Sequence, residues 1–220
     1  MTTFYKEKLE NGITLIIKSN KFTPRTCINV CINGGNCAEK IPGVSDIVTR
    51  LLLEGTKSRS SEQIAIEADQ NAIEFEYDIK HDYSRVRATF LNEDVDKALD
   101  LLSDVIQNPT FEKLEKELML LDGEIEADLD SPRVKVSDNL IKTMYPNGHP
   151  YGVVSSIIKE NIKNIKLQDV KDYYEKIFVS SNIVIVVVGD VSEDIVKEKI
   201  LKSFDSLKQG EFFTRSIETP

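Results

Sequence analysis

The chain has 220 residues, a net charge of -9 and a pI near 4.9, and 40% of its residues are hydrophobic and 30% charged. These values are typical of one soluble domain, and the acidity disfavours binding to nucleic acid or anionic lipid. No apolar run approaches the roughly 18 residues of a membrane span. Residues 1–8 contain no apolar signal core, so we expect a cytoplasmic protein, with export left open if the chain is a fragment.

The first residues follow strand patterns. In "KEKLENGITLIIKSN" two alternating runs flank Asn11-Gly12, which predicts a β-hairpin. "TCINVCING" predicts a third strand, on which Cys27 and Cys31 share one face in a buried structural role rather than a metal or redox role. Together with Cys37 they make an odd number of cysteines, so we expect reduced thiols.

Two helices and a second pair of strands follow. Apolar residues return at helical spacing from Ser45 to Leu53, with Ser45 or Asp46 as the N-cap. "SSEQIAIEADQNA" predicts a helix that begins with a capping box at Ser60 or Ser61. "IEFEYDIKHDYSRVRATFLN" alternates for most of its length and predicts two paired strands.

The rest of the chain is mainly helical. Helices are predicted for "EDVDKALDLLSDVIQ", "FEKLEKELMLLDGEIEADLD", "PRVKVSDNLIKTMYP", "LQDVKDYYEKIF" and "SEDIVKEKILKSF", with Pro132 in a first helical turn. The apolar run "NIVIVVVGD" predicts a buried strand. This mixed order indicates one α+β domain over residues 1–210, followed by a tail or the start of a linker over 211–220.

Charged side chains collect on two of the predicted helices. Asp46, Thr49 and Arg50 share one face of the first helix. On the helix of residues 111–130, acidic side chains border the apolar arc, namely Glu117, Glu124 and Asp128. Taken separately, these patterns favour a surface ion pair between Asp46 and Arg50 and a solvated acidic helix edge.

Six segments matter together, in this order along the chain: "LENGITLIIKSN", "GVSDIVTRLLLEGTKSRSSEQI", "DVDKALDLLSDVIQNPTF", the stretch from Glu117 and Glu124 through Ser131-Pro132, "YPNGHPYG" and "NIVIVVVGDV". They resemble the insulinase/pitrilysin family of zinc peptidases, which includes mitochondrial processing peptidase and the core proteins of the respiratory bc1 complex. The resemblance covers nearly the whole chain. It implies an insulinase-like α+β domain with a mostly antiparallel sheet packed with helices, normally one half of a two-domain subunit.

In that family, H-x-x-E-H on the first helix supplies two zinc ligands and the general base, and a later glutamate is the third ligand. The matching histidine positions are Asp46 and Arg50, and the base position is Thr49. Glu124 matches the third ligand and Glu117 a second acidic residue. The resemblance therefore implies a degenerate site without zinc or another cofactor, and we expect Arg50 to reach Glu124 while Asp46 holds the guanidinium.

Three functions remain open. The first is a non-catalytic half of a peptide-enclosing chamber, which supports proteolysis by a zinc-bearing subunit or domain of the family. The second is an assembly or scaffold protein without a proteolytic partner. The third is a hydrolase with an altered centre, built from Glu117, Glu124, Asp128 and one of the two histidines, His81 or His149.

The resemblance also implies a place for an unfolded peptide. A substrate strand would pair with the edge formed by Glu74, Phe75, Glu76, Tyr77 and Asp78, whose alternation suits an exposed strand. The alternative is an interior strand with both edges paired. A second copy of this chain is an alternative to the zinc-bearing partner.

Overall fold

The computed structural model describes residues 4–146 and 148–215. A mixed six-stranded sheet forms its centre, in the order β1-β2-β6-β3-β5-β4. The strands are β1 (Tyr5–Lys8), β2 (Thr14–Ser19), β3 (Arg25–Asn33), β4 (Glu74–Ile79), β5 (Tyr83–Leu91) and β6 (Ile183–Gly189). Neighbouring strands are antiparallel except β2 and β6, which are parallel. The predicted α+β class is confirmed.

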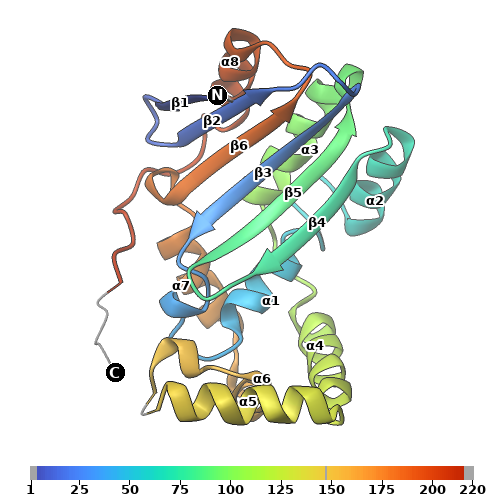
Figure 1. Cartoon of the computed structure of the whole chain (residues 1–220). Helices are drawn as coiled ribbons and strands as arrows, with labels where there is room; N and C mark the ends of the chain where they lie inside the picture. Colours follow the sequence, from blue (N-terminus) through green and yellow to red (C-terminus); the bar gives the residue numbers. More distant parts are fainter. Residues whose placement is uncertain (1–3, 147, 216–220) are drawn as a thin grey trace.

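Helices pack against one face of the sheet and extend beyond its lower end (Figure 1). They are α1 (Val44–Leu51), α2 (Ser61–Gln70), α3 (Val95–Gln107), α4 (Leu114–Leu129), α5 (Pro132–Met144), α6 (Ser155–Asn161), α7 (Leu167–Ile177) and α8 (Glu193–Ser203). The short helix α6 was not predicted. No helix in the described ranges is long and apolar enough to cross a membrane.

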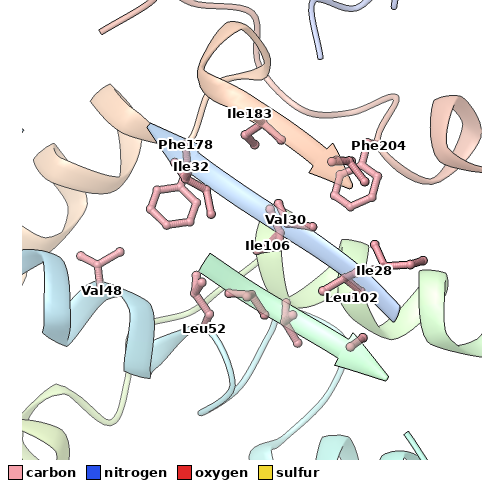
Figure 2. Close-up of a cluster of buried hydrophobic side chains, with 14 of the residues drawn as sticks. Ile28, Val30, Ile32, Val48, Leu52, Leu102, Ile106, Phe178, Ile183 and Phe204 are labelled. Atoms are coloured by element: carbon pink, nitrogen blue, oxygen red, sulfur yellow. The ribbon is translucent and has the colours of Figure 1, made fainter. Parts of the chain in front are cut away.

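The core lies between the sheet and these helices. Alternation along β3 sends Ile28, Val30 and Ile32 into it, where they meet side chains from the helices, as Figure 2 shows. Cys27 and Cys31 share the opposite face, as expected, but are only half-buried, so the predicted burial was wrong. The branched aliphatic side chains occupy the core face, and the period of two sends both cysteines to the other side. All three cysteines are free.

Local signals predicted several elements correctly. β1 and β2 pair as the hairpin around Asn11-Gly12. Ser60 caps α2 in a capping box with Gln63, and Pro132 lies in the first turn of α5. β4 and β5 pair in antiparallel register, from Glu74 opposite Thr89 to Ile79 opposite Ser84.

The start of α1 differs from the prediction. Gly43 is the N-cap, with a left-handed φ of 98°, and a Cβ at this position would lie 2.8 Å from Cγ2 of Ile158. The carboxylate of Glu39 accepts hydrogen bonds from the backbone N–H groups of Gly43 and Ser45, at 3.1 and 3.0 Å. The helix is therefore capped by a side chain outside it, and neither Ser45 nor Asp46 has this role.

The segment that follows α8 is attached to the domain. The Phe213 N–H donates to Asn182, and Asn33 donates to the Phe213 carbonyl. Arg215 forms an ion pair with Asp82 and donates to the Tyr151 hydroxyl. Residues 211–215 thus contact the domain, although the boundary at residue 210 stays a prediction. Residues 216–220, the rest of the predicted tail, lie outside the described residues.

Candidate functional site

Arg50 connects α1 to α4. Its Nη1 and Nη2 donate to Oε1 and Oε2 of Glu124 at 3.2 and 2.5 Å, so the guanidinium and the carboxylate meet through two parallel hydrogen bonds. The Arg50 side chain is 12% exposed, whereas that of Glu124 is 56% exposed. The predicted contact is confirmed. Its bidentate geometry is the one in which arginine binds a carboxylate most strongly.

Asp46 completes the arrangement from one turn earlier on α1. Its Oδ1 accepts from Nε of Arg50 at 2.5 Å, so the predicted support of the guanidinium is also confirmed. Burial acts to lower the pKa of Arg50, but the hydrogen bonds that its guanidinium donates to Glu124 and the negative charge of Asp46 outweigh burial and raise the pKa above its ordinary value. The arginine is therefore a permanent cation held between two carboxylates.

Thr49 lies on the buried side of α1 rather than beside Asp46 and Arg50. Its side chain is fully buried, and its hydroxyl donates to the Ser45 carbonyl at 2.8 Å. The sequence placed all three residues on one face, but a short β-branched side chain at the border of that face turns inward and bonds to its own helix. A hydroxyl cannot act as the general base that a carboxylate would be. It also does not face the cluster of Asp46, Arg50 and Glu124, called the Arg50 cluster below.

The acidic row on α4 divides into three environments. Glu117 is buried and pairs with Lys116 at 3.3 Å, whereas Glu124 binds Arg50 and Asp128 is exposed. The predicted apolar arc packs as expected, because Leu121 and Ile125 are buried and its remaining leucines lie partly buried against the core. Only Glu124 of the row reaches α1 through a hydrogen bond in the described structure.

Strand β4 forms one edge of the sheet, so the alternative of an interior strand is excluded. Lys80 donates its N–H to the Tyr83 carbonyl in the turn to β5, so these two residues are a hydrogen-bonded pair. Along an antiparallel ladder, hydrogen-bonded pairs alternate with pairs that do not bond to each other. The backbone groups of Glu74, Glu76 and Asp78 therefore face β5. Those of Phe75, Tyr77 and Ile79 face outward, and no other described backbone group pairs with them.

The outward edge of β4 lies beside the Arg50 cluster. The ring of Tyr77 has its centroid 5.8 Å from Cζ of Arg50. Near the start of the strand, a cleft of about 560 Å³ separates it from α2, with Phe75, Ile73, Ile64 and Leu53 among its apolar walls. The contact of Tyr77 with Arg50 was not predicted, because no local signal joins residues on a strand and a helix that are far apart in the sequence.

Both histidines belong to a different cluster. The rings of His81 and His149 lie 4.8 and 5.5 Å from that of Tyr151, and the Tyr151 N–H donates to Nδ1 of His149. Burial lowers the pKa of His81. No group of three or more histidine, cysteine or acidic side chains in the described ranges is arranged to hold a metal ion.

The chain is an α+β domain with a six-stranded sheet, helices on one face, and an edge strand beside a site shared by α1 and α4. Residues 14–153 match the family model described as insulinase (peptidase family M16), and residues 164–220 match the model described as peptidase M16 inactive domain. The chain belongs to the insulinase family, peptidase family M16.

Similar curated proteins carry different descriptions. The chain is 29% identical to an uncharacterized zinc protease of Rickettsia felis, over 94% of this chain and 51% of that protein. It is 25% identical to the non-peptidase homolog YmxG of Helicobacter pylori, over 95% and 49%. Identity to the mitochondrial-processing peptidase subunit beta of Neurospora crassa is 26%, over 90% and 42%. The chain thus spans about half the length of these relatives.

Solved structures have the same fold. A peptidase M16 inactive domain from Pseudomonas fluorescens superposes with a TM-score of 0.91 at 22% identity, over 99% of this chain and 54% of that one. A protease from Helicobacter pylori gives 0.89 at 21% identity, over 99% and 53%. At this identity the match establishes the fold.

The side chains between α1 and α4 do not fit a zinc ion. Zinc takes imidazole, thiolate or carboxylate ligands, and a catalytic site keeps three of them. Here the acceptor atoms of Asp46 and Glu124 already bind Arg50, whose fixed positive charge would repel a cation placed between them. A carboxylate that turned to a metal would lose its ion pair with this largely buried guanidinium.

Proposed function

We propose that this domain is a non-catalytic half of a peptide-enclosing chamber, which supports proteolysis by a zinc-bearing subunit or domain of the same family. The observation that carries the proposal is the Arg50 cluster: a cation held by Asp46 and Glu124 joins the two helices, and a buried hydroxyl stands at the general-base position. The description of one similar protein as a non-peptidase homolog, and of others as subunits of a processing peptidase, supports this proposal.

Within this proposal, the domain binds extended peptide at the edge of β4. The outward N–H and C=O groups of Phe75, Tyr77 and Ile79 can pair with an added strand, and backbone pairing accepts many sequences. Side chains of the added strand that alternate toward the helices would meet the Phe75 cleft at one end and the Tyr77–Arg50 contact further along. Such a surface retains unfolded peptide without cleaving it.

Two variants of Tyr77 test the peptide site. Tyr77→Pro removes the outward N–H and leaves the hydrogen bonds to β5 in place, whereas Tyr77→Ala removes the ring alone. A fluorescently labelled unfolded peptide should lose most of its binding to the proline variant and keep backbone-dependent binding to the alanine variant. Equal binding of both variants and the parent chain, measured by fluorescence anisotropy, would contradict a peptide site at β4.

The scaffold alternative predicts no effect of this domain on any peptidase. The altered-hydrolase alternative has less support. Glu124 is bound to Arg50, and the two histidines pack against Tyr151 instead of lying beside Glu124. Peptide cleavage by the purified chain that persists in the presence of a chelator would favour this last alternative.

A further inference from the structure

Helices α4 and α5 expose several large apolar side chains to solvent. Helix α5 lies along the lower end of the molecule in Figure 1, next to α4. Val136, Leu140 and Met144 recur every four residues on α5 and are each more than half exposed. Met119 is more exposed than any of them, and Leu120 is also exposed, both on α4. We refer to these five exposed apolar side chains, on two helices that follow one another in the chain, as the patch.

The exposed apolar side chains of α5 are not on the side of the helix that packs against the domain. Asp138, on the opposite side of α5, is buried and accepts hydrogen bonds from the Ser156 N–H and hydroxyl at 3.4 and 3.3 Å. Ile141 and Tyr145 are partly buried on that same side. The helix is therefore apolar on two faces, and only one of them is used within the domain.

The charges around the patch have opposite signs on the two helices. On α5, the only acidic residue is the buried Asp138, and Arg133, Lys135 and Lys142 are exposed. None of these three bases forms an ion pair with any described residue. Arg133 lies one turn before Val136 on the apolar stripe, so a positive charge stands within the patch itself.

Helix α4 supplies the complementary charge. Glu115 lies one turn before Met119, and it has no ion-pair partner in the part of the chain that the structure describes. Glu126, two turns after Met119, pairs with Lys159 but keeps most of its side chain in solvent. Between them, a Cβ added at Gly123 would meet nothing within 4 Å, so this side of α4 is open to a close neighbour.

We propose that a second copy of this chain covers this surface, with the α5 of each protomer against the α4 of its partner around a two-fold axis. A two-fold axis applies every contact twice, so a patch that is basic on one helix and acidic on the next is complementary to itself. Arg133 of one protomer then faces Glu115 of the other, and the exposed apolar side chains from both helices form the centre. Charge complementarity favours this partner over an unfolded peptide, which offers no fixed pattern of charge.

The size of the purified chain tests the proposal. Sedimentation equilibrium should give a concentration-dependent mass that approaches twice the chain's 24.9 kDa. Leu140→Glu should raise the dimer dissociation constant by about tenfold or more, because it places a charge in the desolvated centre. Ile195→Glu on α8 is the matched control, since Ile195 is exposed to a similar degree away from the patch, and it should leave the constant unchanged.

Charge reversals test the pairing itself. Arg133→Glu and Glu115→Lys should each weaken the dimer, and the combined variant should recover much of the loss. Tyr77→Pro should not change the dimer, which separates this surface from the β4 edge and lets either proposal fail alone. A chain that stays monomeric up to about 100 µM, a range in which specific dimers form, would overturn the proposal. So would a dimer that Leu140→Glu leaves intact, or one that unfolded peptide dissociates by competing for the patch.

Discussion

Arg50 and Glu124 meet through two hydrogen bonds across the space between α1 and α4, with Asp46 holding the third side of the guanidinium. The resemblance to the zinc peptidases assigns both of these positions to ligands of the family's metal. The fixed positive charge of Arg50 gives the acidic side chains of both helices a partner.

Replacing Arg50 by methionine should destabilise the domain, although the exposure of Glu124 limits the effect. Methionine keeps much of the packing of the stem and removes the charge, so Asp46 and Glu124 lose their common partner. We expect a loss of about 1–2 kcal/mol in the free energy of unfolding. In a double-mutant cycle with Glu124→Gln, urea denaturation should give a coupling of about 0.5–1.5 kcal/mol. Glu126→Gln, on the same helix, serves as the control, and a coupling near zero would show that the contact has no energetic role.

The site should accept zinc once the arginine is removed. Asp46→His together with Arg50→His places two imidazoles one turn apart on α1, facing Glu124, which makes three ligands. Calorimetry should detect one zinc ion per chain in this variant, and the further change Glu124→Ala should weaken binding strongly. Zinc binding that is indifferent to Glu124 would mean that the two helices are not arranged as described. No hydrolysis is expected, because position 49 still lacks a base.

Asp104 should make the domain sensitive to acid. Burial acts to raise its pKa, but hydrogen bonds from Ser58, Thr56 and Arg59 outweigh burial and hold the pKa below the ordinary value of 3.8. The carboxyl of Asp104 therefore binds a proton more readily in the unfolded chain than in the folded one. Its contribution to stability is complete above about pH 5 and is lost as the pH falls through the folded-state pKa.

Asp104→Asn should cost about 2–4 kcal/mol at pH 7, since it leaves a largely buried set of donors without their carboxylate. Its stability should then change less between pH 5 and pH 3 than that of the parent chain. Asp100→Asn, which affects an exposed partner of Arg59, should have a much smaller effect in the same denaturation series. Parallel pH profiles of the Asp104 variant and the parent chain would contradict this assignment.

Two glycines should respond in opposite directions to the same substitution. Gly123→Ala should stabilise the monomer by about 0.5–1 kcal/mol, because the new methyl group meets nothing and alanine favours the helix. Gly43→Ala should destabilise it by about 1–3 kcal/mol, because its φ is 98° and its Cβ would press on Ile158. Thermal unfolding at low protein concentration compares the two, and a shift of the same sign would be inconsistent with the described backbone.

The sequence predicted what depends on neighbouring residues. Asn11-Gly12 determines a hairpin, and Ser60 with Gln63 a helix start, because the interacting groups lie within a few residues of each other. The strand order was not predicted, since parallel pairing of β2 with β6 joins segments from opposite ends of the chain. The cap of α1 was missed for a related reason, because Glu39 lies outside the helix and beyond the usual capping positions.

The Arg50–Glu124 contact was predicted although it joins residues 74 positions apart in the sequence. The resemblance placed both positions around one metal site, and arginine is the residue that can satisfy a carboxylate left without its metal. The inward turn of Thr49 was not predicted, because helical periodicity places a residue at the border of a face without deciding which side its short side chain takes.

The central claim, that this domain supports a zinc-bearing relative without cleaving peptide itself, is tested most directly by mixing. The purified chain is combined with a zinc-bearing family member from the same genome, and cleavage of an unfolded peptide is followed with and without a chelator. The account predicts no cleavage by this chain alone, and a higher kcat/KM of the relative in its presence, which Tyr77→Pro abolishes and Tyr77→Ala largely keeps. Chelator-sensitive cleavage by the chain alone, or a relative whose kcat/KM is unchanged by the added chain, would contradict it.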